Sequence, residues 1–392
     1  LAQVSPGDWW RLDFQTLAHA PLGASPVTGG TVFRVWAPNA SAARVRGSFN
    51  NWSASATPMT RLGDDFIAFA PGAEPGDAYK FYFNNFLWKP DPRARWMDGS
   101  NSYNSVIVDP NAYQWQNPHF TPAPAEEWVV YQLHVGTFAG LNDPFGGAGW
   151  PSGYRDVAER VDHLADLGIN AVMLNPTYEF PGSQSGGYNP VTAYAMESSY
   201  GSAEDFKYMV DTLHGAGIAV ILDTVWNHFS SSDNFLWDFD GSQIYYDSPQ
   251  VDTPWGAQAD FDRPEVRDYF VDSVMFTMGE NKLDGMRHDA IYEMVSATQW
   301  AGGQQIINDS MDLIRSRFPD SQVIAEIYNN DPWNTSPGGL DLDGQYHEAF
   351  KNAIDAAIDQ AGFGDPDMWR LANTINGSGP WCNYTAPPPT WP

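Results

Sequence analysis

The chain has 392 residues, which is long enough for two or three domains and a large core. Its formal net charge of −28 at pH 7, spread along the whole chain, argues against nucleic acid and anionic membranes as partners, because both would repel it. No apolar run reaches the length of a membrane-spanning helix, and the single cysteine, Cys382, excludes a disulfide framework and a cysteine-based metal site.

Short β-strands are expected in the N-terminal part of the chain. Alternating, strand-like stretches there are separated by breaks rich in Pro and Asn. The clearest stretches are residues 31–39, 41–53 and 77–85. They predict a small β-sandwich within residues 1–110. The region that follows contains four Pro between 109 and 127 and has little periodicity, so residues 111–127 are predicted to be a linker.

From residue 128 onward, strand-like and helix-like runs alternate. Strands are expected at 128–135, 169–174, 218–223, 283–289 and 322–327, and helices at 154–168, 203–217, 263–281 and 303–319. Strict alternation requires parallel strands with right-handed crossovers. No Gly-rich phosphate loop follows the first strand, which disfavours an open doubly wound sheet. The pattern therefore predicts an α/β domain, a (β/α)8 TIM-type barrel, over residues 128–392.

In such barrels the active site lies at the C-terminal ends of the strands. Reading those ends gives His134, Asn175, Asp223, Asn227, His228, Arg287, Asp289 and Glu326. Along an extended strand, Arg287 and Asp289 share one face, where the guanidinium would keep the carboxylate ionised. A less charged setting would give Glu326 the raised pKa of a general acid. Two such carboxylates are what retaining glycoside cleavage requires.

The residues alone leave other functions open. A strand-end Asp, or His228 taken by itself, can be a hydrogen-bonded structural residue. A cluster of Asp, His and Glu can also bind a divalent metal, and such an enzyme would lose activity with a chelator. No His-x-His pair and no second close-spaced His pair occurs near these strand ends, so we predict neither a metal nor a cofactor.

Several stretches resemble signature regions of glycoside hydrolase family 13, the α-amylase family. They are "DTVWNH" (223–228), "GMRHDA" (285–290) and "AEI" around Glu326, which correspond to the first three of four regions. The resemblance implies that Asp289 is the nucleophile and Glu326 the general acid/base, with Arg287 holding the nucleophile.

The same resemblance implies which residues contact the sugar. In "SGGYNP" (185–190), Tyr188 would stack under the sugar at the cleavage point, and His228 would bond the same sugar. Asp223 and Asn227 would support the site. His134, at the end of the first strand, is a further candidate substrate contact.

Two features favour the glucan-branching side of the family. "YQLHVGTF" (131–138) and residues 225–241 resemble glucan branching enzymes. An N-terminal module with "VWAPNA" and "FNNW" resembles a glycogen-binding sandwich of carbohydrate-binding family 48. The resemblance makes Trp52, together with Trp88 and Lys89, a candidate sugar contact. Alternatively, Trp52 packs inside the sandwich.

The implied partner is an α-glucan such as starch, glycogen or a malto-oligosaccharide. The implied reaction is retaining cleavage of α-1,4-glucosidic bonds, leaning to 1,4-α-glucan branching. Branching and hydrolysis differ only in the acceptor, so an α-amylase-type or debranching hydrolase is the alternative. The sequence leaves open whether the protein is secreted or cytoplasmic.

The resemblance breaks after Glu326. The family's fourth region carries a His-Asp pair, and no such dipeptide follows here. Residues 343–350 are expected to form the sixth strand and the start of its helix, and the Pro-rich residues 385–392 look unlike a strand. We therefore expect a barrel lacking its last two strands and the C-terminal β-domain. Its two open sheet edges would be completed by a missing C-terminal segment or by a partner. A catalytically impaired glucan-binding protein is the alternative of another class.

Overall fold

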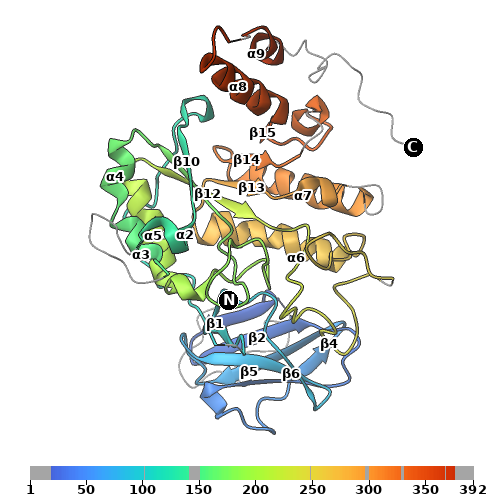
Figure 1. Ribbon diagram of the computed structural model, residues 1–392. Helices are drawn as coiled ribbons and strands as arrows, with labels where there is room; N and C mark the ends of the chain where they lie inside the picture. Colours follow the sequence, from blue (N-terminus) through green and yellow to red (C-terminus); the bar gives the residue numbers. More distant parts are fainter. Residues whose placement is uncertain are drawn as a thin grey trace.

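The structure is a computed structural model that describes residues 19–100, 102–140, 151–247, 249–295, 300–327, 331–366 and 368–375. Two antiparallel sheets form the N-terminal sandwich (blue in Figure 1). One sheet contains, in order, β1 (Gly23–Val27), β2 (Gly30–Trp36), β5 (Asp65–Pro71) and β4 (Thr60–Leu62). The other contains β3 (Ala43–Gly47), β6 (Ala78–Phe83), β9 (Ser105–Val106) and β8 (Trp96–Met97), with β7 (Leu87–Lys89) paired to β6. The predicted sandwich is confirmed: Phe33 of β2 packs against Tyr79 of β6, with ring centroids 4.9 Å apart.

Six parallel strands form the second part of the fold. In spatial order they are β10 (Val130–Leu133), β11 (Ala171–Leu174), β12 (Ala219–Thr224), β13 (Gly285–His288), β14 (Gln322–Ala325) and β15 (Gly344–Gln345). Helices flank the curled sheet (Figure 1). They are α2 (Val135–Phe138), α3 (Tyr154–Ala158), α4 (Val161–Asp166), α5 (Ala203–Gly215), α6 (Pro264–Val274), α7 (Trp300–Arg317), α8 (Glu348–Ala361) and α9 (Met368–Ile375). This parallel half-barrel confirms the predicted fold class, including the sixth strand.

The central strands are apolar because both of their faces are covered. Every residue of β11 and of β12 is buried, and the two strands pair in register from Ala171 opposite Ala219 onward. The edge strand β10 differs, since Val130 is 42% and Tyr131 37% exposed. Within the described residues β10 and β15 each pair with a single strand, so both predicted open edges are present there.

Two predicted helices differ from the expected ones. The helix expected at 154–168 is broken between α3 and α4. In a continuous helix the Arg160 amide would donate to the Asp156 carbonyl, but here the Arg160 guanidinium donates to that carbonyl at 2.7 Å. The Arg160 amide donates to the Val157 carbonyl. The helix expected at 263–281 ends as an α-helix at Val274 and continues as a π-helical turn, Met275–Glu280. Among the described helices, none is both long enough and apolar enough to cross a bilayer.

The sandwich is tied to the barrel at the segment between β12 and α6. Lys89 Nζ donates to Phe235 O at 2.9 Å and also to Trp237 O. Asn84 Nδ2 donates to Asp240 O at 2.9 Å. The Lys89–Phe235 and Asn84–Asp240 bonds join residues 146 and 156 positions apart in the sequence, and they fix this segment between the two parts of the fold (yellow in Figure 1).

Candidate active site

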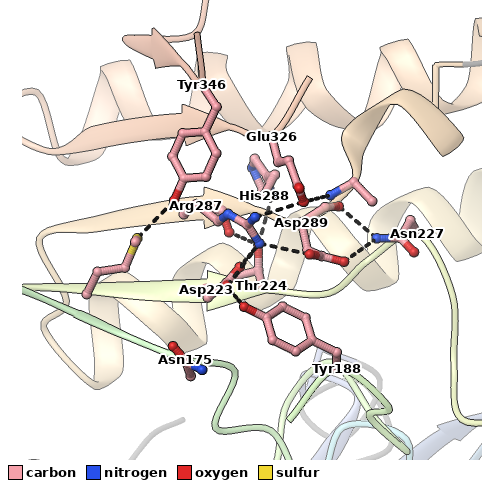
Figure 2. A network of polar contacts seen from close by, with 12 residues as sticks. Asn175, Tyr188, Asp223, Thr224, Asn227, Arg287, His288, Asp289, Glu326 and Tyr346 are labelled. Atoms are coloured by element: carbon pink, nitrogen blue, oxygen red, sulfur yellow. Dashed lines mark hydrogen bonds and ion pairs between the residues drawn. The ribbon is translucent and has the colours of Figure 1, made fainter. Parts of the chain in front are cut away.

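One arginine stands at the centre of the strand ends. Arg287 Nη1 donates to both carboxylate oxygens of Asp223, at 2.7 and 2.9 Å, and to Asp289 Oδ1 at 2.8 Å. Its Nη2 donates to Glu326 Oε2 at 2.8 Å (Figure 2). Strand register explains the convergence, because Asp223 of β12 lies directly opposite Arg287 of β13, and Glu326 follows the last residue of β14. Three carboxylates therefore share one guanidinium.

The chain turns sharply after Asp289, and two further donors, the Ala290 amide and the Asn227 side chain, orient the carboxylates. Ala290 adopts a left-handed conformation with φ 40°, an uncommon one for a residue with a side chain. Its amide donates to Glu326 Oε2 at 3.1 Å. Asn227 Nδ2 donates to Asp289 Oδ2 at 3.1 Å and to the Asp289 carbonyl at 2.7 Å. Both carboxylates are thus held in one orientation before any substrate arrives.

His288 confirms the alternation predicted for this strand, since it points away from the carboxylates. Its Nδ1 bonds with Thr224 Oγ1 at 2.8 Å, and its ring lies 4.6 Å from that of Trp226. Burial lowers the pKa of His288 to about 3, and the nearby Arg287 acts in the same direction. The imidazole is therefore a neutral packing group at ordinary pH.

A single guanidinium cannot balance three carboxylates, two of them buried (Asp223 and Asp289), and the pKa values reflect this. Burial raises the pKa of Asp223 to about 7, against the opposing attraction and hydrogen bonds of Arg287. Burial also raises the pKa of Asp289, while Arg287 and Asn227 oppose the shift. The pKa of Arg287 itself is raised, because its carboxylates, Asp223 above all, outweigh the burial that would lower it. Arg287 thus stays charged, and it only partly offsets the cost of ionising its neighbours.

Two sequence expectations change as a result. Arg287 does contact Asp289, but burial outweighs the attraction of a charge that is shared with two other acids, so the pKa of Asp289 is raised rather than lowered. The expectation of a less charged setting for Glu326 was wrong, because Glu326 accepts from the same guanidinium.

Tyr188 and His228 stand at the edge of this network. The Tyr188 hydroxyl donates to Asp223 Oδ2 at 2.8 Å (Figure 2). The turn before it needs glycine: Gly187 has φ +90°, and a Cβ there would lie 2.0 Å from Pro176 O. His228 Nε2 bonds to the Tyr188 carbonyl at 3.0 Å, and since a carbonyl only accepts, this nitrogen carries the hydrogen. Burial lowers the pKa of His228 to about 4, so the ring is neutral at pH 7.

Two buried glutamates close the loop that presents Tyr188. Glu179 accepts from the Ser198 amide at 2.9 Å and from its hydroxyl at 3.0 Å. Glu197, on the other side of the closure, accepts from the Phe180 amide at 3.1 Å. Burial, and after it the charge of Glu197, together raise the pKa of Glu179 to about 8, against the hydrogen bonds from Ser198. The base of this loop therefore favours a protonated Glu179.

Two of the predicted site residues lie apart from the carboxylates. His134 bonds to Ser185 O at 2.8 Å and to the Tyr200 hydroxyl at 3.1 Å, and it lines a neighbouring cavity of about 340 Å³. Trp52 belongs to the sandwich, where its ring lies 6.1 Å from that of Trp88. The expectation for Lys89 was wrong, because its ammonium is buried against carbonyls of the barrel.

Sequence reasoning missed two aromatic neighbours of the network. The Tyr346 ring lies 5.2 Å from the Arg287 guanidinium (Figure 2), and Trp255 lies 5.7 Å from the His228 ring. Tyr346 directly follows β15, so the strand-end rule could have found it. Trp255 lies in a long connection, and no local pattern marks it. Among the described residues, no group of three or more His, Cys, Asp or Glu is arranged to hold a metal ion.

A β-sandwich joined to a parallel half-barrel, with three carboxylates and an arginine gathered at the strand ends, defines a barrel protein with an acidic site at its strand ends. Residues 152–255 match the family described as alpha amylase, catalytic domain, and residues 21–112 match carbohydrate-binding module 48, the isoamylase N-terminal domain. The chain belongs to the α-amylase family.

Relatives of known name support the same assignment. The chain is 31% identical over 390 residues to the 1,4-alpha-glucan branching enzyme of Halothermothrix orenii, with 88% of this chain and 61% of that protein covered. It is 36% identical over 298 residues to a branching enzyme of Streptomyces coelicolor, covering 70% of this chain and 38% of the relative. A solved pullulanase from Bacillus acidopullulyticus shares the fold, with a TM-score of 0.73 at 24% identity over 91% of this chain and 50% of that one. The chain thus spans only part of the length of these relatives.

Proposed function

We propose that the protein cleaves α-1,4-glucosidic bonds by double displacement and transfers the released glucan to a hydroxyl acceptor, as in 1,4-α-glucan branching. Asp289 attacks the anomeric carbon, and Glu326 protonates the departing oxygen. Glu326 then deprotonates the acceptor that releases the sugar from Asp289. No cofactor enters this sequence of steps.

The observation that carries the proposal is that Asp289 and Glu326 accept from the same guanidinium, each at 2.8 Å. Retaining enzymes hold their two carboxyl groups about 5–5.5 Å apart, whereas inverting enzymes leave about 6.5–9.5 Å for a water molecule. Bonds to neighbouring nitrogens of one guanidinium favour the shorter separation. Arg287 keeps both groups in place and offsets part of their charge.

The other site residues bind and orient the sugar. Tyr188 offers its ring to the reacting unit while its hydroxyl orients Asp223. His228 contributes a neutral ring beside it, and Asn227 orients Asp289. His134 contacts the substrate from the neighbouring cavity.

We assign residues 1–110 to a glucan-binding sandwich, 111–127 to the linker and 128–392 to the catalytic barrel. Two tryptophans support the role of the sandwich: Trp52 is half-buried beside Trp88, which is 40% exposed. Aromatic faces of this kind suit the apolar faces of glucose units. The partner is an α-glucan, and the strongly acidic chain would repel nucleic acid and anionic membranes.

Branching is favoured because the curated relatives reported above carry that name. An α-amylase-type or debranching hydrolase is the second candidate, since the pullulanase shares the fold and the chemistry differs only in the acceptor. A glucan-binding protein with impaired catalysis is the third, because the sequence has no His-Asp pair after Glu326. The edge strands β10 and β15 would be completed by a further segment or by a partner.

Proton NMR of amylose incubated with the purified chain separates these candidates. New α-1,6 signals support branching, and new reducing-end signals without them support hydrolysis. Asp289→Asn should abolish either product. Products that persist in Asp289→Asn would overturn the assignment of the nucleophile, and a folded wild-type chain that forms no product but binds glucan would favour the binding protein.

A further inference from the structure

A cavity of about 240 Å³ lies at the other end of the barrel strands from the carboxylate network. Asp284 and Ser321, which line it, directly precede β13 and β14, whereas Asp289 and Glu326 directly follow those two strands. The end of α5, the end of α7 and part of the linker form the remaining walls. The cavity is therefore separate from the site proposed for the reaction.

Two basic side chains without a partner line this cavity. Among the described basic residues, only Lys282, Arg317 and Arg370 have a side chain with neither a hydrogen bond nor an ion pair, and the first two line the cavity. Lys282 Nζ lies 5.5 Å from the centroid of the Trp115 ring. Every other described basic side chain is bound to a carboxylate or to a carbonyl. Two unpaired cations in one cavity of a chain with 48 acidic and 20 basic residues indicate a site for an anion.

A buried His–Asp pair forms the neighbouring wall. His214 Nε2 donates to Asp284 Oδ2 at 2.9 Å, because a carboxylate only accepts. The Val220 amide donates to the same oxygen at 2.8 Å, so the charge of Asp284 is used within the protein. His214 is 5% exposed, and its Nδ1 is buried without a hydrogen-bond partner, which is rare for a polar atom in a protein interior. The cavity wall thus contains an unsatisfied nitrogen as well as two unpaired cations.

The rest of the cavity is apolar and fixed in place. The Phe120 ring stacks on the His214 imidazole, with centroids 4.1 Å apart and planes 16° from parallel. The linker that carries Phe120 is held by Asn117, whose amide donates to Asp211 Oδ1 at 2.8 Å and whose Nδ2 donates to the Asp211 carbonyl at 2.9 Å. Further apolar surface comes from Pro122, Met278, Leu283, Phe318 and Pro319. The volume is below the about 300–1,000 Å³ of sites for drug-sized molecules, so the cavity suits a small ligand.

We propose that this cavity binds a phosphate monoester with a compact organic body. Lys282 and Arg317 hold the phosphate, and the body lies against the apolar wall at Phe120. Guanidinium and ammonium groups are the side chains that recognise phosphate oxygens, and a doubly charged phosphate can engage both at once. Asp320 also lines the cavity and repels an anion, so both cations are needed to hold the ligand. The assignment concerns a second ligand and does not depend on the reaction proposed at Asp289.

The phosphate should also stabilise the fold, because it joins segments that are distant in the sequence. Lys282 precedes β13, whereas Arg317 is the last residue of α7. A ligand that binds the folded chain but not the unfolded one raises the melting temperature as its concentration rises. Thermal melts therefore give a second readout beside direct binding.

The test is isothermal titration of the wild-type chain with AMP, glucose 6-phosphate and inorganic phosphate, and with adenosine and glucose as ligands without phosphate. Both esters should bind more tightly than inorganic phosphate, and the tighter ester identifies the body as a flat base or a sugar. Lys282→Met and Arg317→Met should each weaken the tighter ester about 10-fold, the equivalent of about 1.4 kcal/mol. Lys282→Arg, which keeps the charge, should bind as the wild type does. Arg370→Met is the matched control, because Arg370 is also an unpaired arginine and lies on α9, away from the cavity.

Each contrary result overturns a stated part of the proposal. Unchanged affinity in Lys282→Met and Arg317→Met proteins with wild-type melting temperatures would overturn the location. Inorganic phosphate that binds as tightly as both esters would overturn the organic body, and adenosine or glucose that binds as tightly as its ester would overturn the role of the phosphate. A wild-type chain that binds none of the phosphates at millimolar concentration would overturn the site. Glucan products in the NMR assay are independent of all these results, so failure here leaves the proposed reaction standing.

Discussion

Replacing Arg287 with methionine removes the charge that three carboxylates share while keeping a side chain of similar reach. Arg287 and Asp223 have side-chain exposures of 6% and 0%, so solvent cannot replace the lost contacts. Breaking a buried ion pair by removing one partner costs about 3–5 kcal/mol. Since Asp289 and Glu326 lose the same partner, Arg287→Met should lower the free energy of unfolding by about 4–5 kcal/mol at pH 8.

The loss should depend on pH. The pKa of Asp223 in the folded protein is about 7, above its ordinary 3.8, so ionising this group costs folded-state stability as the pH rises through 7. Without Arg287 the pKa of Asp223 moves higher still. The free energy of unfolding of the variant therefore goes on falling at pH values above 7, where that of the wild type has levelled off. At pH 5 Asp223 is protonated in the variant, and the difference between the two proteins should be smaller.

Urea unfolding at pH 5 and pH 8, followed by tryptophan fluorescence, measures both quantities. Arg315→Met is the matched control: Arg315 contacts Asp343 at 2.7 Å but is 35% exposed, so its loss should cost about 1 kcal/mol or less. A loss under about 1 kcal/mol for Arg287→Met at pH 8, or the same loss at both pH values, would refute the account of a shared, desolvated charge.

Three further changes probe the surroundings of the site. Glu179→Gln should raise the melting temperature at pH 8–9 and have little effect at pH 4. The pKa of Glu179 is about 8 in the folded protein, so the wild type loses stability as the pH climbs toward that value; an equal gain at both pH values would count against this. Gly256→Ala should lower the free energy of unfolding by about 1–3 kcal/mol, since the new methyl meets Phe229 O. An unchanged urea midpoint would show that the hairpin of residues 252–257 moves away at no cost. Tyr188→Phe should lower the free energy of unfolding by about 1–2 kcal/mol, because it removes the donor to Asp223, while its ring should still bind sugar. A loss of maltose binding in calorimetry would contradict the separate roles given to hydroxyl and ring.

Much of the fold could be predicted because the barrel strands are buried on both faces. The run at 218–223 is apolar up to Asp223, and it forms β12 almost as expected. Once the strands are known to be parallel, their ends must meet, which is why Arg287 and Glu326 could be expected in one place. The break at Arg160 was not predictable, since it depends on a side chain that takes a backbone acceptor.

The electrostatics of the site depend on contacts that no local pattern records. Division of one charge among three acids follows from the register of three strands and from the turn at Ala290. The mistaken role for Lys89 has the same origin, because its partner Phe235 lies 146 residues away. Trp255 was missed because it lies in a hairpin of residues 252–257 whose place is set by a bond from the Phe229 amide to Ala257 O. No repeating sequence pattern marks such a contact.

The central claim, that Asp289 attacks the sugar, is tested most directly by trapping the covalent intermediate. A 5-fluoro-α-glucosyl fluoride carries a leaving group that needs no proton, and Glu326→Gln should slow release of the sugar once it is bound. Peptide mass spectrometry of that variant should find the fluoroglucosyl group on Asp289 and none in the Asp289→Asn, Glu326→Gln double variant. A label on another carboxylate, or release of fluoride with inversion and without any adduct, would contradict the account.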